Sequence, residues 1–223
     1  MLEIVDKIPV ILNALPYILQ GSVVTLITVI GSLALGFCIG LPLAVLQVYG
    51  PSFIRRLIGV YVWFFRGMPI LLLLFLFYFG LFEVIGLNLS TITASCLVLG
   101  MSQIFRGSIE TLPVGQFRAA RALGMNDGQA IRHIVLPQAL RLSIPGWSNE
   151  FSILLKDSAL CFVLGTPEIM ARTHFVASRT YEHLPLYITA GLLYFGITLV
   201  GVHILRVLER KVHIPGYAVS GSM

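Results

Sequence analysis

An uncharged stretch near the amino terminus constrains the fold of this chain more than any other feature. The residues from Ile8 to Ile54 include no Asp, Glu, Lys or Arg. At about 1.5 Å per helical residue, this stretch is far longer than the ~30 Å hydrocarbon core of a bilayer. It cannot be one straight span: Pro9 and Pro16 indicate an interfacial first part, and residues 20–46 are expected to form the first span, with Pro42 near its inner end.

The rest of the chain is equally typical of a membrane protein. Of its 223 residues, 57% are hydrophobic and 11% are charged, whereas a soluble domain carries about 25% charged residues. The sequence therefore predicts an all-α membrane protein with one transmembrane domain over residues 1–223. Further spans are expected at residues 70–82, 91–105, 142–164 and 185–205, an interfacial elbow at residues 53–65 and an outer segment with a short helix at residues 166–183.

The positive charges predict the orientation of these five spans. Of the 15 Lys and Arg residues, three fall on the proposed outside (Lys7, Arg172 and Arg179) and Lys156 lies within a span. The other eleven fall on the proposed inside: Arg55, Arg56, Arg66, Arg106, Arg118, Arg121, Arg132, Arg141, Arg206, Arg210 and Lys211. Because cytoplasmic loops carry an excess of Lys and Arg, the amino terminus is expected outside and the carboxy terminus in the cytoplasm. The net charge of +5 thus follows from topology, and no nucleic acid is expected as a partner.

A polar, basic segment interrupts the apolar chain at residues 115–141. Its first part predicts a short amphipathic helix, because small and apolar side chains recur there at positions i, i+3 and i+7. Gly124 is expected to end this helix, and Asn-Asp-Gly at residues 126–128 supplies a turn. A second helical stretch over residues 130–136 follows and is interrupted by Pro137. The sequence therefore predicts helix, turn and helix in a cytoplasmic loop that covers about residues 106–141.

The spacing of this loop carries a resemblance to a known family. The order Ala119-Ala120, Gly124, Ile134 and Leu136-Pro137 resembles the "EAA" loop of permease subunits in binding-protein-dependent ABC importers. One position departs from the pattern, since Arg118 occupies the place of the family's usual glutamate. Four further segments are similar to the polar amino-acid uptake branch (histidine, glutamine, arginine and glutamate permeases): Gly115-Gln116, Leu136-Pro137-Gln138-Ala139, Asn149-Glu150 and residues 155–160, Leu-Lys-Asp-Ser-Ala-Leu. Arg66-Gly67-Met68-Pro69 resembles the family's Arg-Gly-Thr-Pro entry to the second span, with Met68 in place of the usual threonine.

The resemblance implies a type I importer permease fold in a prokaryotic cytoplasmic (inner) membrane. Such a subunit passes polar amino acids inward by alternating access, together with an external binding protein, a cytoplasmic ABC ATPase dimer and a second permease subunit. The chain itself lacks a G-x-x-x-x-G-K-[ST] loop, so it is expected to be no enzyme and to bind no cofactor, with ATP and Mg on the partner ATPase. The residues implied in ATPase coupling are Gln116, Phe117, Arg118, Ala119, Ala120, Arg121, Leu123, Gly124 and Met125.

Ionisable residues in the predicted fourth span are the candidates for contact with substrate. A charged group at the bilayer centre costs at least ~2.5 kcal/mol, so it is expected to face protein or water. We expect Asn149 and Glu150 to line a mid-membrane pocket in which the carboxylate takes an ammonium group or a basic side chain. The alternative is an internal ion pair of Lys156 with Glu150 or Asp157. Pro145-Gly146 is expected to break the helix and present polar backbone.

Other functions remain open at this level. Glu150 and Asp157 would also suit a secondary amino-acid transporter that uses an ion gradient, and Arg118 would suit a non-transporting half of a heterodimeric permease. The scattered histidines and isolated cysteines predict no metal site. The sequence leaves open which amino acid is carried, although Glu150 favours a cationic or zwitterionic one.

Overall fold

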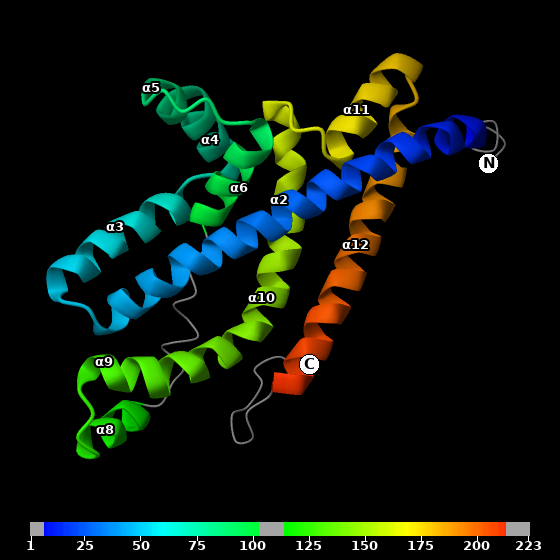
Figure 1. Ribbon diagram of the computed structural model, residues 1–223. Coiled ribbons are helices and arrows are strands. Elements are labelled where there is room, and N and C mark those ends of the chain that lie inside the picture. The colour runs from blue at the N-terminus through cyan, green and yellow to red at the C-terminus, as the bar shows by residue number, and fades with distance from the viewer. Residues whose placement is uncertain (1–6, 103–113, 213–223) are drawn as a thin grey trace.

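The computed structural model describes residues 7–102 and 114–212, and all regular secondary structure in these ranges is helical (Figure 1). Residues 103–105 of the expected third span and residues 106–113 of the expected loop lie outside the described residues. The elements are α2 (Ile8–Tyr49), α3 (Ser52–Gly67), α4 (Ile70–Phe75), the π-helix η1 (Leu76–Leu81), α5 (Phe82–Val84), α6 (Thr91–Met101), α8 (Val114–Ala122), α9 (Asp127–Ala130), the π-helix η2 (Ile131–Val135), α10 (Leu136–Ser158), the 3-10 helix η3 (Ala159–Leu164), α11 (Ile169–Thr180) and α12 (His183–Val212).

Two of the described helices, α2 and α12, are each long and apolar enough to cross a membrane. The segment from α3 to α5 is also long and apolar enough to cross a membrane if its two parts, Ser52–Gly67 and Ile70–Val84, are taken together. These two parts meet at a bend of 109°. This bend lies where the sequence predicts the change from interfacial elbow to second span. The number of five spans and the orientation of the termini stay predictions.

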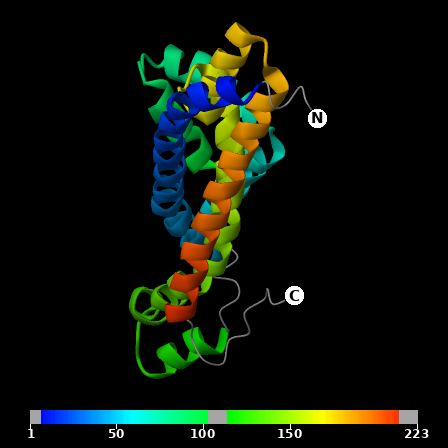
Figure 2. The same cartoon turned by 90° about the vertical axis from the view of Figure 1, so that its right-hand side faces the viewer.

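The first helix is continuous over both the expected interfacial part and the expected first span. α2 is one uninterrupted helix of 42 residues with Pro16 and Pro42 inside it, and the division into an interfacial part and a span over residues 20–46 stays a prediction. Figure 2 shows that its first turns run across the top of the molecule before the helix descends. Proline removes one backbone hydrogen bond and bends a helix, and packing on both sides of the bend keeps the helix continuous.

Small residues allow α2 to pack closely along α6. A Cβ atom added at Gly100 would lie 3.0 Å from both the Leu35 Cβ and the Ser32 carbonyl oxygen, and one added at Gly31 would lie 2.9 Å from the Cys96 sulfur. Small residues at helix interfaces let backbones approach in a membrane, where the hydrophobic effect does not drive helices together. The small residues that the sequence places in the first span therefore serve this contact.

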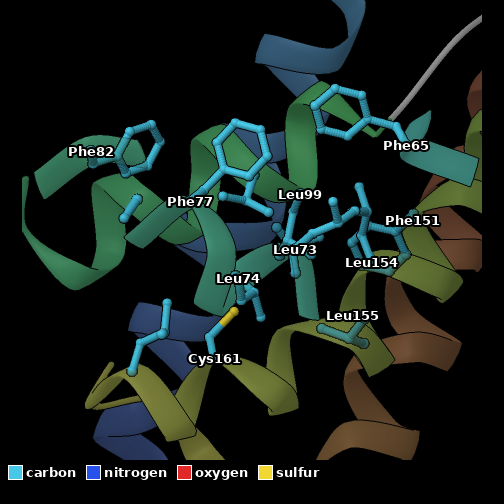
Figure 3. Packing of buried hydrophobic residues seen from close by; sticks show 14 residues of the cluster. Phe65, Leu73, Leu74, Phe77, Phe82, Leu99, Phe151, Leu154, Leu155 and Cys161 are labelled. Atoms are coloured by element: carbon cyan, nitrogen blue, oxygen red, sulfur yellow. The ribbon is translucent and has the colours of Figure 1, made fainter. Parts of the chain in front are cut away.

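The main apolar core lies where α3, α4, η1, α5, α6 and α10 meet, and Figure 3 shows its packing. Leu73, Leu99, Leu154 and Leu155 are fully buried. Aromatic rings extend the core outward, with the Phe65 and Phe77 centroids 5.6 Å apart. The core fixes α10, the helix that carries the candidate substrate residues, against α4 and α6.

The structure corrects the prediction that α10 is broken at Pro145-Gly146. The helix runs from Leu136 to Ser158 without interruption, and Figure 1 shows that it changes direction along its length. Contacts with α12 and α2 hold α10 and keep the helix continuous past this point. The polar backbone expected at this point is therefore not presented.

Candidate functional site

The basic loop folds as the helix, turn and helix that its sequence predicts. Helix α8 ends at Ala122, and Gly124 adopts a left-handed conformation with φ of 85°. The Met125 amide donates to the Ala120 carbonyl and the Gly124 amide to the Arg121 carbonyl, which is the hydrogen-bond pattern of a Schellman motif. We call residues 114–135, which comprise α8, this turn, α9 and η2, the coupling unit.

The second helix of the coupling unit begins at a capping box. The Asn126 side chain accepts from the Gln129 amide at 2.9 Å, and the Gln129 side chain accepts from the Asn126 amide at 3.0 Å. This reciprocal pair satisfies two backbone donors that a helix start otherwise leaves free. Arg121 also forms a salt bridge of 3.2 Å with Asp127 across the turn. The turn is thus fixed by local interactions, and this explains why the sequence alone predicts it.

One face of α8 packs against the end of α2, and the opposite face is exposed. Ala120 is buried and Phe117 is half-buried, and the Phe117 ring lies 5.0 Å from the Tyr49 ring at the end of α2. Leu123 is 81% exposed, although it is a large apolar residue. The remaining residues implied in coupling are the exposed Gln116, Arg118, Ala119, Arg121 and Gly124 and the half-buried Met125.

The coupling unit is continuous with α10. The π-helix η2 joins α9 directly to Leu136, the first residue of α10. Pro137 therefore lies in the first turn of α10, where proline is tolerated, and does not interrupt the helical segment as the sequence predicted. Val135 and Ala139 are buried together with Ala44 of α2. The coupling unit is therefore held by the inner end of α2 and by α10, the helix that carries the candidate substrate residues.

The structure places Asn149 and Glu150 on α10, with Asn149 exposed and Glu150 half-buried. The charges of Arg66, at the end of α3, and of Asp157 act on Glu150. The sequence did not predict this proximity, because it assigned Arg66 to the membrane surface and the two residues lie far apart in the chain.

The expected ion pair of Lys156 with Glu150 or Asp157 is not formed. Among the described residues, none of these three side chains takes part in a salt bridge, and the Lys156 side chain is exposed. Adjacent residues on a helix point about 100° apart, which separates Lys156 from the face of Glu150 and Asp157. The site instead presents the carboxylates of Glu150 and Asp157 on one face of α10, and Lys156 lies off that face.

The chain matches a family model over most of its length. Residues 36–214 match the model described as "Binding-protein-dependent transport system inner membrane component". The arginine transport system permease protein ArtQ of Bacillus subtilis (strain 168) is 33% identical over 206 residues, which cover 88% of this chain and 93% of that protein. The histidine/lysine/arginine/ornithine transport system permease protein HisM of Salmonella typhimurium (strain LT2) is 31% identical over 210 residues, 87% of this chain and 89% of that protein.

Two chains of solved transporter structures have folds similar to the fold of this chain. A chain from the crystal structure of an amino acid ABC transporter with histidines superposes with a TM-score of 0.79 at 30% identity, covering 90% of this chain and 96% of that one. A chain of the inward-facing MetNI methionine ABC transporter superposes with a TM-score of 0.75 at 21% identity, covering 90% and 98%. The second likeness shows the fold alone.

Proposed function

Because this chain belongs to the family of binding-protein-dependent transport system inner membrane components, we propose that it carries polar amino acids into the cytoplasm by alternating access. It is a membrane subunit of an ABC importer and a multi-pass protein of the inner membrane. The observation that carries the proposal is the coupling unit, which presents an exposed apolar residue beside basic ones and is continuous with the helix of the candidate site. Partner subunits supply the energy and deliver the substrate.

Energy enters through α8 in this proposal. Leu123, which follows the last residue of α8, offers an exposed apolar contact to a groove on the cytoplasmic ABC ATPase, which binds ATP and Mg, and Arg118 of α8 adds a positive charge. Removing such an exposed apolar side chain from water favours docking by about 25 cal/mol per Å². Arg118 favours an acidic residue in the groove, the reverse of the charge that the family's usual glutamate would select.

The motion reaches α10 through packed contacts. Phe117 packs on Tyr49 of α2, and Val135 and Ala139 are buried against Ala44. A displacement of α8 is therefore passed to both α2 and α10, because closely packed interfaces shift between discrete arrangements rather than deform. Alternating access follows when nucleotide binding and hydrolysis on the ATPase bias two such arrangements.

The candidate site suits an ammonium group. Glu150 can attract the ammonium group or basic side chain of an amino acid, and Asp157 lies on the same face of α10. Since neither carboxylate takes part in a salt bridge among the described residues, no ion pair has to be broken before the substrate binds. Relatives named for arginine and for histidine, lysine, arginine and ornithine agree with a basic amino acid as substrate.

A second permease subunit completes the pathway. The outer face of α12 leaves large apolar residues exposed, among them Leu192, Phe195, Leu199 and Val200. This face fits lipid or a second copy or relative of this chain. Two subunits, a cytoplasmic ATPase dimer and an external binding protein form the transporter in this proposal.

The test of the substrate site is the removal of one charge. In proteoliposomes with the ATPase and the binding protein, Glu150→Gln is expected to raise the KM for a basic amino acid by at least about tenfold, or about 1.4 kcal/mol. The exposed Glu83 provides a matched control, and Glu83→Gln is expected to leave uptake unchanged. Undiminished uptake by Glu150→Gln would contradict the assignment and favour a silent half of a heterodimer. Uptake by the chain alone, driven by an ion gradient, would instead support a secondary transporter.

A further inference from the structure

Helix α3 turns one apolar side away from the protein. Phe53, Leu57, Val60 and Trp63 are large apolar residues, and each is between 56% and 75% exposed. Since they recur every three or four residues, they lie next to one another along the helix. A contiguous apolar surface of this kind marks contact with a membrane or a partner. The transport steps proposed above do not use this surface.

A different side of α3 is anchored in the protein. Ile58 and Phe65 are buried, and the Tyr61 ring lies 4.6 Å from the Phe65 ring. The Tyr61 hydroxyl donates to the carbonyl of Met101, the last residue of α6. These contacts fix the rotation of α3 about its own axis. The exposed apolar side therefore faces the surroundings of the protein and cannot turn inward.

The direction of α3 suits a membrane surface. Figures 1 and 2 both show α3 lying across the direction of α12, a helix long and apolar enough to cross a membrane. With 16 residues, α3 is about 24 Å long, shorter than the ~30 Å hydrocarbon core. It begins just after Tyr49, whose ring contacts Phe117 of the coupling unit. Helix α3 thus starts at the membrane face that the orientation predicts to be cytoplasmic.

Two arginines border the apolar side of α3. Arg55 and Arg56 are exposed, and neither forms a salt bridge among the described residues. The sequence contains no acidic residue between Asp6 and Glu83, so no carboxylate nearby in the chain offsets their charge. Arg56 lies four residues before Val60, which places it beside the apolar side. A positive charge is thus available next to an apolar surface.

These features together select an anionic phospholipid. The apolar side chains can enter the acyl region, a tryptophan prefers the membrane interface, and a guanidinium group binds phosphate through two parallel hydrogen bonds. A second copy of this chain is a poorer occupant. A symmetric contact would place the same surface on both subunits and bring arginine towards arginine, which is unfavourable.

We infer that α3 is an interfacial helix that binds anionic phospholipid at the cytoplasmic membrane surface. Arg55 and Arg56 hold the headgroup phosphate, and Phe53, Leu57 and Val60 lie among the acyl chains. Trp63 lies at the boundary between the two. The inference rests on the predicted orientation for the choice of membrane surface, and it does not depend on which substrate is carried.

The experiment uses Trp63 as a built-in probe. The chain has only two tryptophans, so Trp147→Phe leaves Trp63 as the single fluorescent tryptophan. The full chain is placed in phosphatidylcholine bilayers that contain increasing fractions of brominated phosphatidylglycerol or, separately, brominated phosphatidylcholine. Bromine quenches tryptophan fluorescence on contact, so the two quenching curves give the relative affinity for the anionic and the zwitterionic lipid.

The expected result is a preference for phosphatidylglycerol that depends on both arginines. A basic residue near an anionic surface strengthens binding by about fivefold. Arg55→Gln and Arg56→Gln are therefore each expected to lower the preference by up to about fivefold, and the double variant is expected to abolish it. Exposed Arg206 and Arg210 of α12 provide a control with the same loss of charge, and replacing both with Gln is expected to leave the preference unchanged.

The possible results decide for or against the lipid site. Equal quenching by the two lipids in the wild type, or a preference retained by the double arginine variant, would overturn it. Absence of quenching by either lipid would show that protein covers Trp63 and would overturn it as well. If Trp147→Phe does not fold, the same comparison with Trp147 present decides, because the Trp147 signal is common to all variants. No step of the measurement requires transport, so a failure of the proposed function would leave the test intact.

Discussion

Gly201 of α12 offers a sharp test of how the candidate site is supported. A Cβ atom added there would overlap Cε1 and Cζ of the Phe151 ring and lie 3.1 Å from Cδ1. Phe151 is only 7% exposed and belongs to the main core, so its ring has little room to move. We therefore expect Gly201→Ala to separate α10 from α12 and to disturb the neighbouring Glu150.

The magnitude follows from two opposing effects. Alanine favours a helix over glycine by about 1 kcal/mol, whereas adding a methyl group to a filled core costs about 1–3 kcal/mol. Gly196 lies on the same helix, and a Cβ atom added there meets nothing within 4 Å. Gly196→Ala therefore has the helix gain without the collision. The two variants are expected to differ by about 1–3 kcal/mol in the free energy of unfolding.

The assay compares the thermal unfolding of the purified complexes, followed by uptake in proteoliposomes. Gly201→Ala is expected to unfold below Gly196→Ala, and the added substitution Phe151→Leu is expected to recover part of the loss by vacating the ring atoms. Coupling between the two positions in such a double-mutant cycle identifies their contact. If Gly201→Ala is as stable as Gly196→Ala, or if Phe151→Leu brings no recovery, the packing of α10 on α12 described above is wrong.

Two further predictions concern other contacts of the same framework. Gly21→Ala places a Cβ atom 2.8 Å from the backbone of Glu168 and Ile169, and backbone atoms cannot rotate away as a side chain can. The unfolding temperature of Gly21→Ala is therefore expected to fall below that of Gly201→Ala, which meets a side chain. Stability equal to the wild type would refute this close approach. Asn126→Ala removes the capping box of α9 and is expected to cost about 1 kcal/mol, measured as faster hydrogen exchange at the Gln129 and Ala130 amides; unchanged exchange would show that the cap is dispensable.

The family, the helical fold and the local structure of the coupling unit could be predicted from the sequence. The turn between α8 and α9 depends on Gly124 and on the pair Asn126 and Gln129, which lie within a few residues of one another. Short-range signals of this kind identify helix ends without knowledge of the rest of the fold. The resemblance to importer permeases is confirmed by the family match over residues 36–214, and it could be seen in the sequence because each of its motifs is a short run of residues.

The predictions that Pro137 and Pro145 interrupt a helix were wrong. Pro137 lies in the first turn of α10 and Pro145 lies inside it, yet the helix continues from Leu136 to Ser158. A proline removes one hydrogen bond and introduces a bend, while contacts with neighbouring helices on either side of it preserve the helix. Such contacts are tertiary, so they cannot be read from the residues around the proline.

Contacts between distant residues were also missed. The charge of Arg66 on α3 acts on Glu150 of α10, Gly21 of α2 lies against the backbone of Glu168, and the Ile169 amide donates to the Thr25 hydroxyl. The only local signal was Glu168 at the start of a helix, which by itself indicates a cap and not a buried contact. The roles of Asn149 and Glu150 in substrate binding stay predictions for the same reason, because a binding site is assembled from several helices and from a partner subunit.

The claim that nucleotide energy enters this chain through α8 is tested most directly at Leu123. Uptake of radiolabelled arginine is measured in proteoliposomes that hold the chain with its ATPase and binding protein, for the wild type, Leu123→Asp and the conservative Leu123→Met. Because Leu123 is 81% exposed, neither substitution is expected to change the unfolding temperature. The account predicts ATP-dependent uptake by the wild type and by Leu123→Met and a loss of uptake in Leu123→Asp. Undiminished ATP-driven uptake by Leu123→Asp, or uptake by any of them without ATPase, would contradict it.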